Sequence, residues 1–270
     1  MGKNIVLRIK EADENIIKNL INMVDELEEE SIHIFRTSFR KILALNSLIK
    51  ERGIDTPLNI TKEIFMKSGI VRDLQVQIIR AEKKQNMESF INFLKGKEIA
   101  AKLELKDCIR ESNISEIQNE FFEKEKYVVL TFSKKNFIQI IIKKLDKMFS
   151  EFISLLQFME NDVEKIHEIR KKWKKIRYIC EFFVEEFSIS DESIAENKKI
   201  HDTLGELQDL SCTLKFIKEY NLNHKDKKIE KLKKEFEKEI KKQTETIMNM
   251  RDKWITNLLM LREKINNLKE

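Results

Sequence analysis

Glycine and proline are so scarce in this chain that they limit it to one class of fold. The 270 residues include five glycines and one proline, and an all-β fold needs many more of both at its turns. At the same time, 41% of the residues are hydrophobic, which is enough to form one large core or two smaller ones. The sequence therefore predicts an ordered, all-α protein built from long helices.

In the first half of the chain, apolar residues at helical spacing predict three helices and a less regular fourth stretch. The predicted helices cover about residues 11–29, 31–52 and 61–84. Ser31 is the expected N-cap of the second helix, Gly53 is its expected end, and Pro57 lies in the loop that follows. The fourth helical stretch is expected to be broken or kinked near Gly96.

From about residue 134 the same order of helices starts again. The predicted helices cover about residues 134–160, 162–187, 191–220 and 225–268. A turn is expected at residues 188–191 and a linker at residues 221–224. The apolar positions of the last segment, from Ile229 to Leu268, are spaced mostly by three and four residues, as a single long amphipathic helix requires.

Two motifs occur twice in the same order, which indicates an internal repeat. The basic segment His33–Lys41 returns 134 residues later as His167–Lys175, and Gly69–Leu74 returns 136 residues later as Gly205–Leu210. Two elements that repeat at almost one offset are hard to obtain by chance. The sequence therefore predicts two related helical bundles, over residues 8–125 and 134–270.

The first motif of each copy places basic residues on one helical face. His33, Arg36 and Arg40 form a basic stripe beside the apolar stripe, and we expect the basic stripe to lie off the core. The second copy repeats the basic stripe and extends it to Arg177. Like charges one turn apart repel each other by a few tenths of a kcal/mol per pair. A bound anion would compensate, and phosphate suits the face because Arg binds its oxygens in pairs, Lys adds charge and His adds a donor.

These motifs resemble the conserved histidine α-helical domain (CHAD) family. The fullest match is His167-x-x-Arg170-Lys171-x-x-Lys174-Lys175-Ile176-Arg177-Tyr178, while Ser68–Leu74 and Lys199–Asp209 resemble the family's Leu-Gly-x-Leu-Arg-Asp element. The resemblance covers nearly the whole chain. It implies a single CHAD domain over residues 1–270, in which two four-helix bundles related by a pseudo-two-fold axis bind inorganic polyphosphate in an elongated basic groove.

The resemblance also assigns ligand contacts to basic residues of both copies. These residues are His33, Arg36, Arg40, Lys41, His167, Arg170, Lys171, Lys174, Lys175 and Arg177, with Lys62, Lys198 and Lys199 as weaker matches. The chain departs from the family pattern at Leu43, where the second copy has Arg177, and at Gln208, where the first copy has Arg72. We therefore expect the first bundle to bind less tightly.

Other residues of the motifs are expected to support the site. Gly69 and Gly205 are expected to permit close helix approach, and Asp73 and Asp209 to orient basic neighbours rather than to act in catalysis. For Tyr178 the sequence leaves two roles open, because its hydroxyl group could donate to phosphate or its ring could pack.

Charge and cysteine content limit the partners. The chain has 52 basic and 47 acidic residues and a net charge of +5, so its composition alone does not indicate a nucleic-acid or membrane partner. Cys108, Cys180 and Cys212 are far apart, which argues against a disulfide framework and a zinc site and fits a reducing cytoplasm. We expect a cytoplasmic protein without metal or cofactor, and the resemblance implies association with polyphosphate granules.

Three alternatives compete with a polyphosphate binder. One is a phosphate-processing enzyme with His33 or His167 as nucleophile or general acid, although the sequence has no Gly-rich phosphate loop, which favours a protein that is not an enzyme. Another is a general polyanion binder that takes RNA, although most Phe and Trp residues fall on apolar stripes. The third is a helical scaffold without a ligand.

Overall fold

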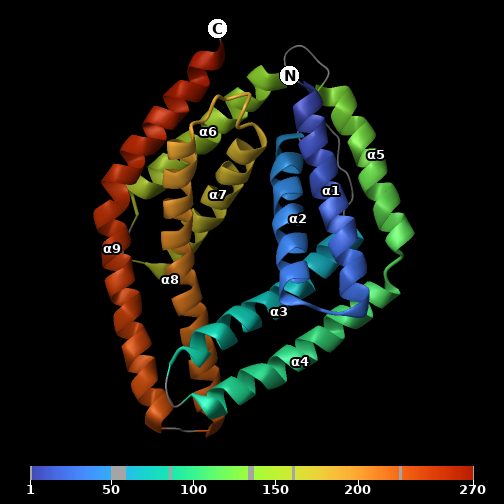
Figure 1. Cartoon of the computed structure of the whole chain (residues 1–270). Helices are drawn as coiled ribbons and strands as arrows, with labels where there is room; N and C mark the ends of the chain where they lie inside the picture. Colours follow the sequence, from blue (N-terminus) through green and yellow to red (C-terminus); the bar gives the residue numbers. More distant parts are fainter. Residues whose placement is uncertain are drawn as a thin grey trace.

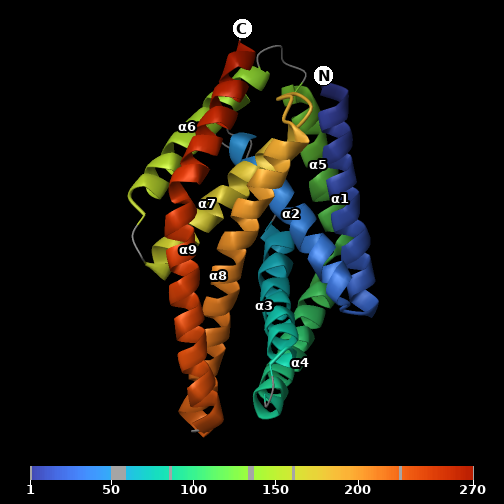
Figure 2. The ribbon, with the colours of Figure 1, turned by 60° about the vertical axis from the view of Figure 1, so that its left-hand side comes forward.

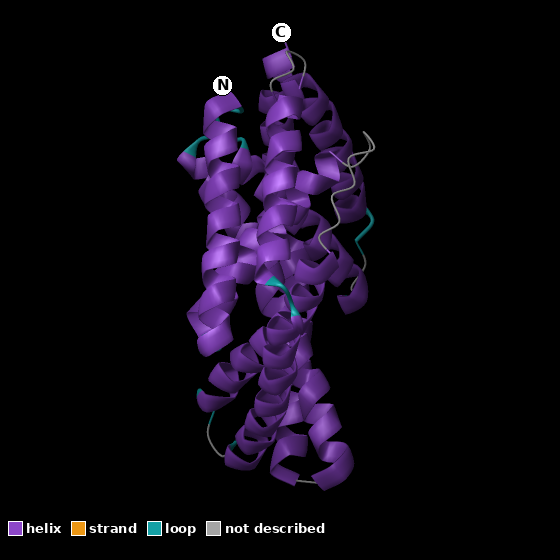
Figure 3. Ribbon diagram, turned by 90° about the vertical axis from the view of Figure 1, so that its right-hand side faces the viewer, coloured by secondary structure: helices purple, strands orange, loops and turns teal. Residues whose placement is uncertain are grey.

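The chain is helical throughout the part that can be described. The structure is a computed structural model that describes residues 2–49, 59–84, 87–132, 137–159, 162–224 and 227–269. Within these residues there is no β-strand (Figure 3), so the all-α prediction is confirmed. The elements are α1 (Gly2–Asp25), α2 (Glu29–Ile49), α3 (Asn59–Glu82), α4 (Glu88–Glu111), α5 (Ile114–Phe132), α6 (Phe137–Gln157), α7 (Val163–Phe182), α8 (Asp191–His224), α9 (Lys227–Asn266) and the short 3-10 segment Asn267–Lys269.

The helices form two groups of four, which is compatible with the expected repeat. α1, α2, α3 and α4 contact one another in a ring, and α6, α7, α8 and α9 do the same. α5 runs along α1 and leads into the second group (Figure 1). The groups meet where α2 packs on α7 and α3 packs on α8, and the pairs α3–α4 and α8–α9 extend together away from the two termini (Figure 2).

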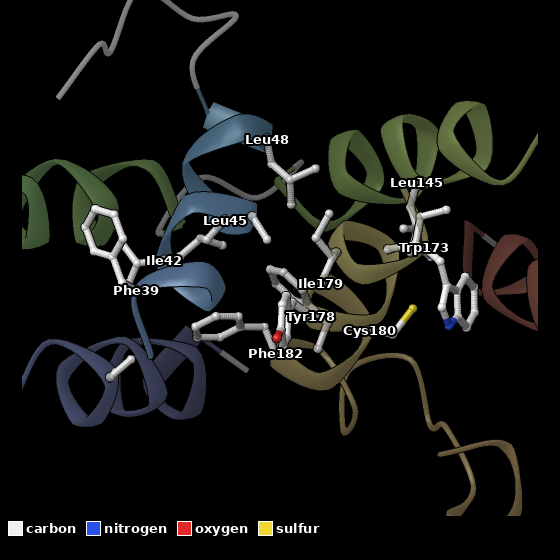
Figure 4. Packing of buried hydrophobic residues seen from close by; sticks show 14 of the residues in the cluster. Phe39, Ile42, Leu45, Leu48, Leu145, Trp173, Tyr178, Ile179, Cys180 and Phe182 are labelled. Carbon is white, nitrogen blue, oxygen red and sulfur yellow. The ribbon is translucent and has the colours of Figure 1, made fainter. Parts of the chain in front are cut away.

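One large core holds the two groups together. Phe35 and Phe39 of α2 and Trp173 of α7 are completely buried in it. Figure 4 shows Leu45 of α2 and Ile179 of α7 in the space between the two helices. Burial of each such large side chain stabilises the fold by about 1.5–3 kcal/mol. The α2–α7 contact therefore holds the side chains beside it in fixed positions.

A second, smaller core joins the far ends of the two helix pairs. Leu74 of α3, Phe90 of α4, Leu210 of α8 and Phe236 of α9 are buried together there. Nearby, Thr213 of α8 donates a buried hydrogen bond to the side chain of Gln77 on α3. The two helix groups are therefore held together by two separate cores. Residues that lie between these cores are on helices that are packed at both places.

Several predicted boundaries in the first half are wrong. α1 begins at Gly2 and α2 at Glu29, so Ser31 is a buried helical residue and not an N-cap. Acidic residues in the first turn of α2 favour this earlier start, since they complement the helix dipole. α4 continues through Gly96, which is exposed and has open space around it. The loop predicted around Gly53 and Pro57 lies outside the described residues.

The sequence also misplaced three boundaries farther along the chain. A separate helix, α5, begins after Asn113, whose side chain accepts hydrogen bonds from the next turn. Residues 221–224 are not a linker, because α8 continues to His224, whose ring stacks on buried Tyr220 at 4.2 Å between centroids. α7 ends at Phe182, and a turn follows in which Ser188 adopts a φ of 48°.

Candidate anion-binding site

α7 presents its basic residues beside the main core. Its N-cap is Asp162, whose carboxylate accepts the backbone N–H of Glu164 at 2.8 Å. The apolar stripe of the helix is buried, and at about 100° per residue the neighbouring stripe contains Arg170, Lys174 and Arg177. Because the core fixes the rotation of α7, these three side chains are turned toward α2 and α8.

α2 contributes two arginines, and one of them is buried. Arg36 is only 7% exposed, so the prediction that it lies off the core is wrong. Its Nη1 donates to the carbonyl oxygen of Phe65 and to Ser68 Oγ at 3.1 Å, and its guanidinium lies over the Phe65 ring, 4.5 Å from the centroid. These partners compensate for its burial. Arg40 lies one turn farther on, 5.7 Å from the same ring.

Two glycines lie against the equivalent arginines of the two copies. A Cβ atom at Gly69 would lie 2.8 Å from Nη1 of Arg36, so the guanidinium occupies the space that any other residue would need. At Gly205 the corresponding distance, to Nη2 of Arg170, is 3.8 Å. Both glycines therefore face arginine side chains, and only at Gly69 would an added Cβ atom force the guanidinium to move.

Six basic side chains lie close enough to influence one another's protonation. We call this set the cationic cluster; its members are Arg36 and Arg40 of α2, Arg170, Lys174 and Arg177 of α7, and His201 of α8. Burial, followed by repulsion from Arg170 and Arg40, lowers the pKa of Lys174 to about 6. Burial and then Arg177 lower the pKa of His201 to about 3, so both groups favour the neutral form at pH 7.

The carboxylates near the cluster leave it with an excess of positive charge. Burial raises the pKa of Asp209, against the opposing influence of Arg170 and Arg80. Glu181 accepts an ion pair from Arg177 at 3.1 Å and lies 4.0 Å from Lys41. Asp73 also favours the charged form of Arg36. Among the described contacts, neither Asp73 nor Asp209 forms an ion pair with a basic side chain, so their role in orienting basic neighbours stays a prediction.

Several buried nitrogen atoms in the cluster have no hydrogen-bond partner. Across the described part of the chain, Nε of Arg36, Nε of Arg170 and Nδ1 of His201 are buried without one. An unsatisfied buried polar group costs about 1–3 kcal/mol, so a ligand that accepts from the Nε atoms of the two arginines would be favoured. The cluster can therefore hold an anion with several acceptor oxygens.

His167 lies beside the cluster and is held by a hydrogen bond. Its Nδ1 bonds to Oε1 of Gln208, and Nε2 of Gln208 donates to Sγ of Cys212 at 3.4 Å. In the first copy, Arg72 forms an ion pair with Glu29 instead. The departure from the family pattern at Gln208 thus corresponds to a fixed orientation of His167.

The remaining predicted residues are more exposed, and some are paired elsewhere. Lys171 forms an ion pair with Glu168 and Lys199 forms one with Glu196, both at 2.8 Å. The other exposed residues among those predicted are His33, Lys62, Lys175 and Lys198. Tyr178 is buried, with the guanidinium of Arg177 4.9 Å from its ring centroid, so it packs.

Sequence reasoning missed His201 as a member of the site. The signal was available, because His201, Gly205 and Gln208 are spaced by four and three residues on one face of α8. The residue lacks a counterpart in the first copy, where Phe65 occupies the position four residues before Gly69. An analysis based on the repeat alone therefore passes over it.

The comparisons with known proteins show the family. The CHAD domain model matches residues 9–218, and the chain belongs to this family. The crystal structure of the CHAD domain from the plant Ricinus communis is similar in fold, with a TM-score of 0.62 and 13% identity over 98% of this chain and 91% of that one. No curated protein matches the chain significantly.

Metal-binding clusters and membrane-spanning helices are both absent from the described residues. In the segments described, no group of three or more His, Cys, Asp or Glu side chains is placed to hold a metal ion. Among these segments, none of the helices has both the length and the apolar content that crossing a bilayer requires.

Proposed function

We propose that this CHAD domain binds inorganic polyphosphate and that the cationic cluster is its binding site. The observation that carries the proposal is the meeting of four arginines with Lys174 and His201, from α2, α7 and α8, in one place, with buried arginine N–H groups that lack partners. Each phosphate unit offers charged oxygens that accept such bonds, and bonds of this kind are stronger than those between neutral groups.

The position of the cluster supports a chain-like ligand over a single anion. Arg40 belongs to the first helix group, while Arg170 and Arg177 belong to the second, so the charges cross the α2–α7 junction. A linear polyanion can satisfy both groups at once, whereas one phosphate ion would leave part of the charge uncompensated. This fits the ligand that the family resemblance implied from the sequence.

Calorimetric titration with long-chain polyphosphate at two salt concentrations tests the proposal. We expect tight binding that weakens as salt rises, because bound cations release counterions from the ligand. An Arg40→Ala, Arg170→Ala double variant should lose at least about tenfold in affinity, since bonds to charged groups contribute about 1.5–3 kcal/mol each. The matched control is Lys172→Ala on α7, whose side chain pairs with Glu151 of α6. Unchanged binding by the double variant would rule out the cluster as the site.

We further propose that the protein binds polyphosphate without hydrolysing it. The Nδ1 atom of His167 is engaged by the Gln208 amide, which is not a base that could activate a nucleophile. A phosphate-release assay that gave more than one equivalent per protein would refute this. In a parallel competition experiment, displacement of polyphosphate by RNA at equal phosphate concentration would identify a general polyanion site instead.

A further inference from the structure

Lys174 lies among arginines of two packed helices. Arg170 and Arg177 lie about one turn before and after it on α7, and α2, which packs on α7, contributes Arg36 and Arg40. From α8, which also packs on α7, the neutral ring of His201 faces it. Among the described residues, no ion pair or hydrogen bond of Lys174 is present. Its neighbours on α7 differ in this respect, because Lys172 pairs with Glu151 of α6 and Arg177 with Glu181.

Two aspartates act on arginines of the cluster and not on Lys174. Asp209 of α8 acts on Arg170, and Asp73 of α3 acts on both Arg36 and Arg170. Asp209 is itself partly buried, and its pKa is raised. Among the described residues, no carboxylate pairs with the amine of Lys174, whereas Arg177 pairs with Glu181 and Arg36 donates to Ser68.

In the free protein, loss of the Lys174 proton would reduce the repulsion between this side chain and the neighbouring arginines. Arginine keeps its proton at any ordinary pH, whereas a buried lysine gives its proton up readily. The combined effect of burial and repulsion makes the amine of Lys174 largely neutral at pH 7. A polyanion in the cluster would reverse the balance, because its oxygens would place negative charge beside the amine.

We infer that Lys174 takes up a proton when a phosphate chain enters the cationic cluster, so that the protein binds polyphosphate and a proton together. This inference rests on the proposed function. The proton comes from the buffer and converts the neutral amine of Lys174 to an ammonium group, which then donates to phosphate oxygens. No other bond is made or broken.

Proton uptake on binding predicts how the affinity for polyphosphate depends on pH. By linkage, a site that gains a proton on binding gains affinity as pH falls, by up to about tenfold per pH unit for one proton. The gain should appear between the pKa of bound Lys174 and about pH 6, the pKa in the free protein. Below about pH 6 the free protein already carries the proton, and the dependence should level off.

Calorimetry in two buffers of different ionisation enthalpy at pH 7.5 measures the coupled proton directly. Long-chain polyphosphate is the probe, because its few terminal groups titrate little compared with its many strongly acidic internal units. For the wild type we expect uptake close to one proton per binding site. For Lys174→Met we expect the uptake to be lost, and for the control Lys172→Met we expect it to be kept.

The outcomes separate this inference from the proposed function. If the wild type binds and its binding enthalpy is the same in both buffers, proton coupling is wrong and the polyphosphate site stands. If the wild type does not bind, the proposed function fails. If Lys174→Met keeps the uptake and His201→Gln loses it, the histidine is the proton acceptor and the assignment to Lys174 is overturned. Circular dichroism of each variant shows whether its helices are intact.

Discussion

Replacing Lys174 with methionine should stabilise the free protein, and the size of the effect should depend on pH. The ordinary pKa of the group is 10.5, and in the fold burial and then Arg170 lower it to about 6. Between these two values the unfolded chain holds a proton that the folded chain lacks. Each pH unit below 10.5 therefore weakens the fold by about 1.4 kcal/mol.

At pH 7 this contribution reaches a ceiling on the order of 5 kcal/mol, and local relaxation of the fold reduces it. Methionine retains most of the aliphatic stem and removes the ionisable group, so the variant should be more stable by a few kcal/mol. Its advantage over the wild type should shrink as pH rises from 7 to 9, and should stop growing below about pH 6. The sign follows because a base with a lowered pKa destabilises the fold at low pH.

Urea unfolding at pH 6, 7.5 and 9, followed by helical circular dichroism, measures this advantage. Lys172→Met is the matched control: its lysine is half-exposed on the same helix and pairs with Glu151. A surface change of this kind should stay within about 0.5 kcal/mol at each pH. The reasoning would be refuted if Lys174→Met were less stable than the wild type, or if its advantage were the same at all three values of pH.

Three further predictions test the frame of the site. Gly69→Ala should displace the guanidinium of Arg36 and destabilise the fold by about 1–3 kcal/mol in urea unfolding, whereas Gly205→Ala has room for the methyl group and should change stability much less; equal effects would contradict the packing argument. Arg170→Ala should lower the slope of log affinity for polyphosphate against log salt by about 0.7, and an unchanged slope would mean that Arg170 makes no phosphate contact. Phe39→Ala should lower the free energy of unfolding by about 3–5 kcal/mol in the same assay, because this fully buried ring packs on Phe65 at 5.0 Å between centroids. A decrease of less than about 1 kcal/mol would contradict its place in the core.

The fold class could be predicted because it depends on composition and local periodicity. Scarce glycine and proline and a regular apolar spacing leave long helices as the solution. The predicted start near residue 162 agrees with α7, which begins at Val163 after the N-cap Asp162. Helix ends were harder, because tertiary contacts decide them. Residues 221–224 look like a linker by composition, yet the stacking of His224 on Tyr220 keeps them in α8.

The site could be predicted only in part for a similar reason. Helical spacing groups Arg170, Lys174 and Arg177 on one face of α7, and the structure brings these three together with arginines of α2. Helical spacing does not show how deeply each side chain is buried. The burial of Arg36 and the lowered pKa of Lys174 could therefore not be predicted from the sequence. Both depend on which helices pack against α2 and α7, and that is a property of the assembled fold.

The most direct test of polyphosphate binding is a crystal structure of the protein with a polyphosphate of intermediate length. We predict a continuous chain of phosphate density across the α2–α7 junction, with oxygens within hydrogen-bond distance of Nε of Arg170 and of the Lys174 amine. Phosphate density confined to the exposed lysines, such as Lys198 and Lys199, with the cationic cluster left empty, would contradict the account.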